Sequence, residues 1–390
     1  MYIFNSTGVT LYHNGITDSK GCYVFDDSGN KYLDLEAGVW CLPLGHKHPQ
    51  IVKSLKDQVD KISHVNYRYN HKISEQAAEK LIEVTGMENG NCIFLSSGSE
   101  AVDLGIRIAK DLLPNKKCIC LSGQYFSAYG YGADTETNDW VKVPWQHGEI
   151  KSENEWSEIL SAIDFEEVGI FVFEAGNSSG VVKLPPKLLV KSIADKINQV
   201  NGIIIVDEVT CGIGRTGKWF GYMHYGLEPD IIAVGKGLGN GYPISAVVFQ
   251  EKVASTLKKT KFRYAQSHQN DPLGCRIAYE VLNQIEQNDL LNRVNDLGCY
   301  LRERVTALLD DNPLIEQIRG IGLMNCIQFS DALSLEDMKK IEEHFFNKNI
   351  IVGINPVAKC LRIYMPFIVD IGMIDIFIEG LKMYGGRYPI

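Results

Sequence analysis

One stretch of the chain, residues 203–237, constrains the fold more than any other. It opens with the apolar run Ile203–Val206, which Asp207 follows directly, and a second apolar run, residues 231–234, leads to Lys236 between two glycines. Short runs of branched residues between turn signals are typical of strands buried on both faces, as in a parallel sheet. Ligands of open α/β sheets bind outside the carboxyl ends of the strands. We therefore expect Asp207 and Lys236 to face one bound molecule from neighbouring strand ends.

The rest of the chain indicates a sheet of the same kind. Six strand candidates alternate with helical patterns or long connections, which predicts a doubly wound α/β sheet between helices. They cover residues 92–95, 118–121, 169–173, 203–206, 231–234 and 246–249. We also expect a hairpin, several helices and a C-terminal α/β unit; these are a hairpin over 21–35, helices over 50–62, 71–84 and 335–347, a helical pattern over 272–310 broken near Asn288 and Gly298, and the unit over 313–390.

Composition excludes several classes of protein. A length of 390 residues suffices for a large domain and a smaller one. A nucleic-acid-binding protein would need a basic stripe, and the net charge of −9 argues against one. No apolar run is long enough to span a membrane. The N-terminus lacks the pattern of a signal peptide. Ten cysteines without C-x-x-C pairs predict reduced thiols in a cytoplasmic protein, and His46 and His48 lack further ligands at metal-binding spacing.

Three short patterns resemble known motifs but fail on one residue each. Residues 212–218 match most of a nucleotide phosphate loop, but Trp219 stands where a magnesium-binding hydroxyl is needed. Residues 235–239 hint at a dinucleotide turn whose third glycine is replaced by Asn240. Residues 176–180 fit the nucleophile elbow of hydrolases, yet no helix pattern follows them. We therefore predict neither a nucleotide-binding protein nor a hydrolase.

Polar and aromatic residues follow other predicted strands. Ser97, Gly98 and Ser99 lie between a strand and a helix, where they form either an anion site at the helix N-terminus or a plain N-cap. Tyr125 follows another strand among glycines, where an aromatic ring stacks on a flat ligand or fills the core, and Glu174 ends a third strand. A strand-end lysine can attack a carbonyl, and a neighbouring aspartate can hold a pyridinium nitrogen protonated. Together these groups match the needs of pyridoxal phosphate.

Two segments carry a resemblance to a known family. Residues 207–217 and 229–243 resemble the signature of class-III aminotransferases, fold-type-I pyridoxal-phosphate enzymes that include ornithine and ω-amino-acid aminotransferases. The resemblance extends to residues 45–49, 97–101 and 319–324 and covers nearly the whole chain. It implies a large cofactor-binding domain over 51–275 with a mostly parallel sheet of the seven-stranded type. A smaller α/β domain would be built from both termini, residues 1–50 and 276–390.

The resemblance also implies roles for single residues. Lys236 matches the Schiff-base lysine and proton carrier, and Asp207 matches the partner of the ring nitrogen. Arg362 matches the arginine that binds the substrate carboxylate, and Trp40 falls where related enzymes line the substrate pocket. Ser267 stands where a threonine usually reaches the cofactor phosphate of the neighbouring subunit, which implies a homodimer with active sites at the subunit interface. The other implied cofactor contacts are Ser97, Gly98, Ser99, Tyr125, Phe126, Glu174, Val209 and Thr210.

Departures from the family pattern concern the substrate. Thr210 replaces a glutamine that contacts the cofactor, Phe126 replaces a histidine or tryptophan, and Ala175 replaces a proline. The glutamate that neutralises the carboxylate arginine in ω-amino-acid enzymes has become the serine pair at 178–179. We therefore expect Arg362 to be permanently used on a substrate carboxylate.

The resulting hypothesis is a homodimeric aminotransferase with a ping-pong mechanism. An amino acid or amine donates its amino group to the cofactor through Lys236, and an oxo acid then accepts it. A racemase or epimerase, or a lyase acting on an amine phosphate, are the alternatives on the same fold. A non-catalytic α/β protein would require that Lys236 carry no cofactor.

Overall fold

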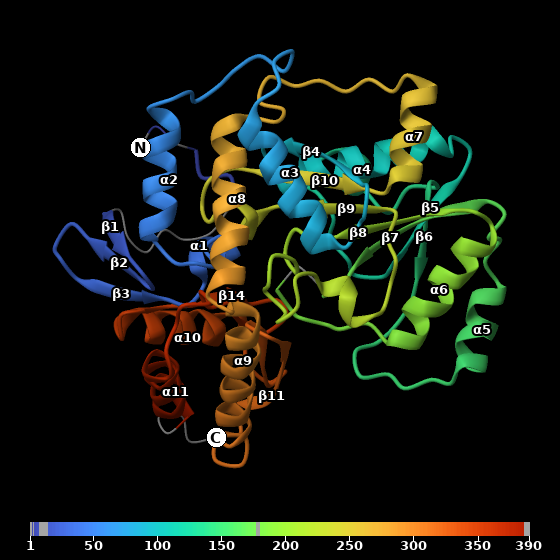
Figure 1. Ribbon diagram of the computed structural model, residues 1–390. Coiled ribbons are helices and arrows are strands. Elements are labelled where there is room, and N and C mark those ends of the chain that lie inside the picture. Colours follow the sequence, from blue (N-terminus) through green and yellow to red (C-terminus); the bar gives the residue numbers. More distant parts are fainter. Residues whose placement is uncertain (1, 3, 8–14, 177–179, 386–390) are drawn as a thin grey trace.

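The large sheet lies at the centre of the molecule. The computed structural model describes residues 2, 4–7, 15–176 and 180–385 (Figure 1). Five neighbouring strands run parallel, from β9 to β6, while β10 runs antiparallel to both β4 and β9. The order across the sheet is β4 (Asn91–Leu95), β10 (Ser245–Phe249), β9 (Ile231–Val234), β8 (Ile203–Asp207), β7 (Val168–Glu174), β5 (Lys117–Leu121) and β6 (Trp140–Val143).

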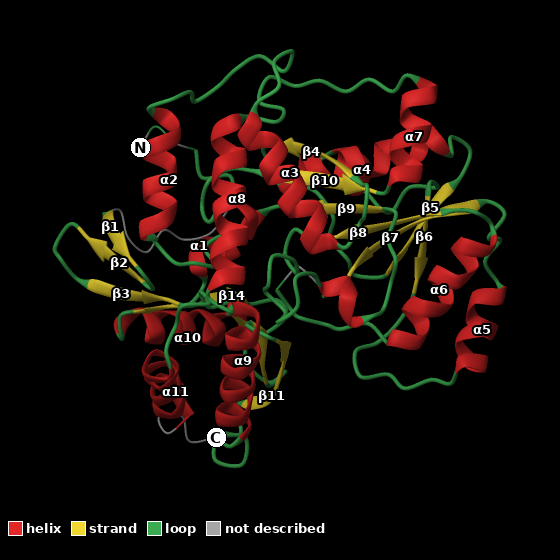
Figure 2. Cartoon of the chain, in the orientation of Figure 1, coloured by secondary structure: helices red, strands yellow, loops and turns green. Residues whose placement is uncertain are grey.

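Helices cover this sheet on two faces, as Figure 2 shows. Alternate side chains of β7 enter different cores: Phe171 and Phe173 belong to one hydrophobic cluster, whereas Ile170 and Val172 belong to the other. This alternation is that of a strand buried on both faces. The second cluster contains α4 (Gly98–Leu112) and α7 (Glu251–Thr260). The first contains α3 (Lys72–Thr85), α5 (Glu153–Ser161), α6 (Lys187–Gln199) and α8 (Pro272–Gln287), with α2 (Pro49–Val59) beside α8.

One of the two smaller sheets combines both ends of the chain. Strand β13 (Ile350–Ile351) pairs in parallel with β3 (Lys31–Asp34) and so joins a C-terminal segment to an N-terminal one. Sheet β1-β2-β3-β13 also contains β1 (Ile16–Lys20) and β2 (Tyr23–Asp26); the other sheet has the order β11 (Ile315–Ile321), β12 (Met324–Phe329), β15 (Cys360–Ile363), β14 (Gly353–Asn355). The helices of this region are α9 (Leu290–Thr306), α10 (Leu335–Asn347) and α11 (Ile371–Gly385), in the lower part of Figure 1.

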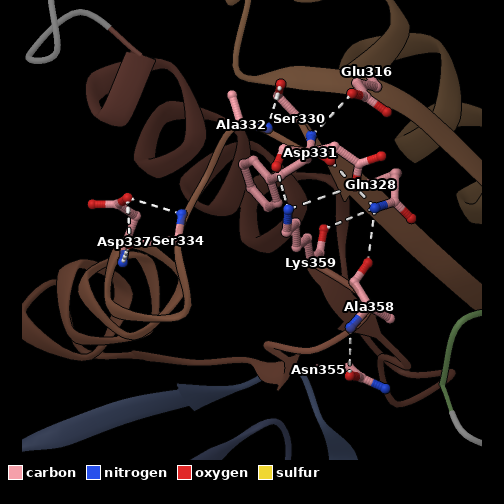
Figure 3. Close-up of polar contacts among 11 residues, drawn as sticks. Glu316, Gln328, Ser330, Asp331, Ala332, Ser334, Asp337, Asn355, Ala358 and Lys359 are labelled. Carbon is pink, nitrogen blue, oxygen red and sulfur yellow. Dashed lines mark hydrogen bonds and ion pairs between the residues drawn. The ribbon is translucent and has the colours of Figure 1, made fainter.

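Side-chain hydrogen bonds fix the outer end of the sheet that contains β15 (Figure 3). The Gln328 amide donates to the carbonyl oxygen of Ala358 at 2.8 Å, and Asn355 Oδ1 accepts from the Ala358 amide at 3.0 Å. Nearby, Ser334 and Asp337 form a capping box at the start of α10. These contacts hold the loop before β15 and hence the strand that carries Arg362.

Most of the predicted elements are present, with two kinds of difference. The six expected strands are β4, β5, β7, β8, β9 and β10, the hairpin is β2–β3, and α10 covers the expected residues. The sequence patterns did not predict β1, β6, β11, β13 and β14. The expected break near Asn288 is real, because Asp289 adopts φ 49 between α8 and α9. The break at Gly298 is wrong: this glycine lies inside α9, where a Cβ would come within 2.0 Å of the Gly322 carbonyl oxygen.

For two further expectations the described residues provide no test. The boundaries 51–275 and 1–50 with 276–390 are still predictions. The residues 177–179, which include the serine pair, lie outside the described residues.

Among the helices that are described, none has both the length and the apolar character needed to cross a bilayer.

Candidate active site

Asp207 and Lys236 come from the carboxyl ends of adjacent parallel strands. Asp207 is the last residue of β8 and pairs with Ala233 of β9, and β9 ends two residues before Lys236. Lys236 has φ 40 and opens the short 3-10 helix η3 (Lys236–Gly239), so the backbone turns sharply at the lysine. Glu174 lies opposite Asp207 at the end of β7. The structure thus brings together the pair on which the sequence analysis was built.

Asp207 is a buried carboxylate with a strongly shifted pKa. Burial raises its pKa from 3.8 to about 7, against the lowering effects of the Val209 amide, 2.9 Å from Oδ1, and of the Lys236 ammonium. Burial of a carboxylate disfavours its charged form unless a cation or several donors face it. Asp207 is therefore suited to hold a cationic group of a bound molecule.

The N-terminus of α4 lies next to the same region. Ser97 is the N-cap, and its hydroxyl accepts from the Glu100 amide. Gly98 allows a close approach, because a Cβ there would lie 2.5 Å from Val209 Cγ1. Ser99 Oγ accepts from the Ala128 amide at 2.9 Å. The N-cap and the anion site are compatible, since the cap uses the Ser97 hydroxyl while the first backbone N–H groups and the helix dipole attract an anion.

Thr210 contacts the lysine directly. Lys236 Nζ donates to Thr210 Oγ1 at 2.8 Å, and Thr210 itself is buried. The hydroxyl therefore positions the end of a flexible side chain whose ammonium has two further N–H donors.

The predicted aromatic and serine contacts lie in different surroundings. Tyr125 is half exposed, whereas Phe126 is buried and stacks on Trp140, with 5.7 Å between the ring centroids. Ser267 is exposed, in the loop that precedes α8. Tyr125 thus remains the ring available to a bound ligand, Phe126 packs into the core behind it, and Ser267 lies on the surface of the chain.

Trp40 connects the lysine to Arg362. Its ring stacks on Tyr364 with centroids 4.4 Å apart. Lys236 Nζ lies 5.2 Å from the Trp40 ring centroid, and the guanidinium carbon of Arg362 lies 5.3 Å from it. Cations near the face of an indole are attracted by its quadrupole. The predicted substrate residues Trp40 and Arg362 therefore lie together, one indole ring away from the lysine.

Comparison with known proteins identifies the family. The family model described as "Aminotransferase class-III" matches residues 5–126 and 121–384. Acetylornithine aminotransferase of Caldanaerobacter subterraneus subsp. tengcongensis is 32% identical over 381 residues, which cover 92% of this chain and 91% of that protein. The chain belongs to the class-III aminotransferases.

Two further proteins are similar to this chain, one in sequence and one in fold. Acetylornithine aminotransferase of Aquifex aeolicus is 29% identical over 375 residues, 93% of this chain and 94% of that protein. In fold, the chain is similar to taurine:2-oxoglutarate aminotransferase from Bifidobacterium kashiwanohense, solved in complex with PLP and glutamate, with a TM-score of 0.88 at 17% identity over 99% and 96% of the two chains. Class-III aminotransferases depend on pyridoxal phosphate. Transamination, rather than the racemase, epimerase or lyase alternative, is therefore the reaction.

The residues of this class-III aminotransferase fit that cofactor. A buried carboxylate with a raised pKa suits a protonated ring nitrogen, and the N-terminus of α4 suits a phosphate. Lys236 follows β9, the strand next to that of Asp207. The donor set is therefore complete for a cationic ring, a carbonyl and a phosphate.

The glycine-rich turn after β8 has a structural role in this aminotransferase. Arg215 is buried and donates to the carbonyl oxygen of Met365 at 2.5 Å, while its guanidinium lies over Phe367. Burial lowers the pKa of Arg215 to about 10. Glu208 accepts from the amides of Gly221 and Tyr222 at 2.7 and 2.8 Å. The turn that mimics a phosphate loop thus anchors the large sheet to the segment after β15.

The sequence analysis missed one charged residue of the site. Glu36 Oε1 accepts from Arg362 Nη2 at 2.9 Å, and both side chains are about four-fifths buried. Arg362 therefore already has an anionic partner. Because the two residues are 326 positions apart, no local spacing could have indicated the pair.

Proposed function

We propose that this class-III aminotransferase moves an amino group from an amino acid or amine to a 2-oxo acid in two half-reactions at the Asp207–Lys236 site. Pyridoxal 5'-phosphate, when bound there, supplies a carbonyl that accepts the amino group and a ring that withdraws electrons. The observation that carries the proposal is the placement of Asp207 and Lys236 on adjacent parallel strand ends beside the N-terminus of α4.

In this proposal each residue has a defined task. Lys236 is the covalent attachment point, and its Nζ moves a proton from the substrate carbon that bears the amino group. Asp207 stays ionised and faces the ring nitrogen, while Thr210 orients Lys236 Nζ. Ser97, Gly98 and Ser99 would hold the phosphate, Tyr125 and Val209 would contact the ring, and the buried Glu174 and Phe126 would contribute further contacts to the cofactor.

The substrate end is formed by Trp40 and Arg362. The guanidinium binds a substrate carboxylate with its planar fork, and Trp40 forms a wall of the substrate pocket. Relatives are named acetylornithine aminotransferases, and one solved structure is named for 2-oxoglutarate. N-acetylornithine with 2-oxoglutarate is therefore the first donor and acceptor pair to test.

The test uses the visible absorbance of the purified protein in buffer saturated with pyridoxal phosphate. We expect a bound-cofactor band that changes to the amino form of the cofactor when a donor is added alone, with release of one equivalent of oxo product. Lys236→Ala should lose the half-reaction, and the exposed Lys117→Ala should keep it. A wild-type protein without a bound-cofactor band would contradict the proposal.

We also propose that the active enzyme is a homodimer with Ser267 of one subunit at the phosphate of the other, in the cytoplasm. The exposure of Ser267 in the loop before α8 supports this arrangement. Mixed dimers of Lys236→Ala and Ser267→Ala chains would then contain one intact site each. Random re-association should restore about a quarter of the wild-type sites, whereas no regain of activity would place Ser267 in the site of its own chain.

A further inference from the structure

Glu36 and Arg362 form an ion pair at the substrate end of the site. Nη2 of the arginine donates to Oε1 of the glutamate at 2.9 Å. Nε of Arg362 is buried and has no hydrogen-bond partner among the described residues. The guanidinium therefore has one of its N–H groups on an internal carboxylate, while its Nε–H has no partner among the described residues.

The backbone around Glu36 is strained. The four residues that follow it, 37–40, all have φ between 50 and 71, which is one turn of left-handed helix. This conformation is unfavourable for residues other than glycine, because Cβ approaches the following carbonyl oxygen. Strain of this kind persists only where the surroundings enforce it, and it is concentrated at functional sites.

Asp34 enforces the turn. Its carboxylate accepts from the amides of Glu36 and Gly38 at 3.0 and 3.1 Å, and His46 Nε2 lies 2.9 Å from its second oxygen. The Tyr364 amide donates to the carbonyl oxygen of Leu35, which ties this segment to the end of β15. Glu36 is thus held against the strand that carries Arg362.

Two glycines leave room for the pair. A Cβ on Gly353 would lie 2.4 Å from Glu36 Oε1 and 3.0 Å from Arg362 Nε, and a Cβ on Gly180 would lie 1.9 Å from Arg362 Cδ. Both positions lack a side chain where one would displace the ion pair. The chain therefore accommodates the glutamate and the arginine together.

We propose that Glu36 is the resident counter-ion of Arg362 and a specificity-determining residue for the transamination reaction. A substrate with a carboxylate at this end displaces Glu36 from the guanidinium, whereas a substrate without one leaves the ion pair intact. The inference rests on the proposed function, because it concerns the substrate end of the same site. It replaces the expectation of an arginine that is always free for a carboxylate.

The charges explain why one site can accept both kinds of substrate. Arg362 alone in a partly buried site would leave an uncompensated cation whenever an uncharged group occupied the pocket. Glu36 removes that penalty and makes the carboxylate-bearing substrate compete for the guanidinium. Burial raises the pKa of Glu36, Arg362 lowers it and Asp34 raises it further, so the displaced carboxylate can take up a proton rather than stay as an isolated charge.

The experiment uses two probes that differ by one carboxylate. Aminooxyacetate and O-methylhydroxylamine attack the cofactor carbonyl through the same nitrogen, with release of the Lys236 amine and no redox step. Neither probe depends on the identity of the natural substrate. The rate of absorbance change of the cofactor-loaded enzyme is measured with each probe, and the ratio of the two rates reports how strongly a carboxylate is favoured.

We expect Glu36→Gln to raise the ratio of aminooxyacetate to O-methylhydroxylamine rates about tenfold, because the competing anion is gone. Glu36→Asp, which retracts the carboxylate by one methylene, should give an intermediate ratio. Glu83→Gln removes an exposed carboxylate from α3 and should leave the ratio unchanged. In an Arg362→Gln background, Glu36→Gln should have no effect on the ratio.

The outcomes separate this inference from the proposed function. If neither probe changes the absorbance of the wild-type protein, no reactive cofactor is present and the proposed function itself is wrong. If both probes react but Glu36→Gln leaves the ratio unchanged, Glu36 does not govern carboxylate binding. A selective slowing of aminooxyacetate by Glu36→Gln would also overturn the inference, because Glu36 would then merely hold Arg362 in position.

Discussion

The two ends of the active site are built in different ways. At the cofactor end, Asp207 and Lys236 extend from adjacent strands of one sheet, and the backbone ladder sets their separation. At the substrate end, Glu36 follows a short strand of one small sheet, and Arg362 belongs to a strand of another. The first end depends on regular structure, and we expect it to serve every substrate alike. The second depends on a strained turn, and we expect it to distinguish one substrate from another.

The largest effect should follow the loss of charge at the cofactor end. Asp207→Asn keeps the shape of the side chain but can no longer hold a ring nitrogen protonated. We expect the half-reaction to slow by roughly 10³-fold, by the same factor for donors with and without a carboxylate. Single-turnover absorbance measures both rates. Asp139→Asn, which changes an exposed aspartate near Lys110, is the matched control. A loss of rate confined to donors with a carboxylate would contradict the division of the site into a cofactor end and a substrate end.

Asp207 should also make the stability of the cofactor-free protein depend on pH. Its folded pKa, about 7, is above its ordinary value of 3.8. Between these values the folded state binds more protons than the unfolded state, so stability is greatest below pH 3.8 and falls as the pH rises to 7. The free energy of unfolding of Asp207→Asn should therefore exceed that of wild type by a few kcal/mol at pH 7 and by little near pH 4.

Denaturant unfolding of both apoproteins across this pH range measures the difference. Glu208, whose pKa burial raises to about 8, titrates in both proteins and largely cancels. A difference that stays constant with pH would mean that Asp207 is ionised throughout. Saturation with pyridoxal phosphate should reduce the pH dependence, since a protonated ring nitrogen stabilises the aspartate anion.

These contrasts explain how much of the site could be predicted. Asp207 and Lys236 could be read from the sequence because each lies within two residues of the end of a short apolar run, and parallel strands place such positions at one edge. The same local logic predicted the six strands and the hairpin. It did not predict β6, whose two middle residues are only partly buried, or the two- and three-residue strands β13 and β14.

Glu36 could not be predicted from any local pattern. Its partner is 326 residues away, and the left-handed turn after it contains Ala37, Val39 and Trp40, which have no preference for positive φ. Long-range contacts, among them the hydrogen bond from the Tyr364 amide to Leu35 and the packing of Trp40 on Tyr364, help to enforce that conformation. Phe126 shows the same limit, because its burial against Trp140 depends on β6.

A smaller and more selective effect is expected at the substrate end. Arg362→Gln removes the charged fork and should lower kcat/KM by roughly 10²-fold for donors with a carboxylate. Donors without one should lose much less, because they make no contact that needs the guanidinium. Steady-state kinetics with a matched pair, such as alanine and 2-aminopropane, compares the two losses. Arg304→Gln, at an exposed ion pair with Asp375, serves as control, and equal losses for both donors would assign Arg362 to the structure of the site.

The smallest effect should come from Thr210, which lies at the cofactor end and whose hydroxyl accepts a hydrogen bond from the lysine. Thr210→Val keeps the volume and removes the hydroxyl that accepts from Lys236 Nζ at 2.8 Å. One neutral acceptor contributes about 1 kcal/mol, so the half-reaction should slow roughly fivefold for all donors. Thr210→Ser should retain most of the rate, because it keeps the acceptor. A loss as large as that of Asp207→Asn would show that Thr210 contacts the reacting atoms and that the cofactor end contains a third catalytic group.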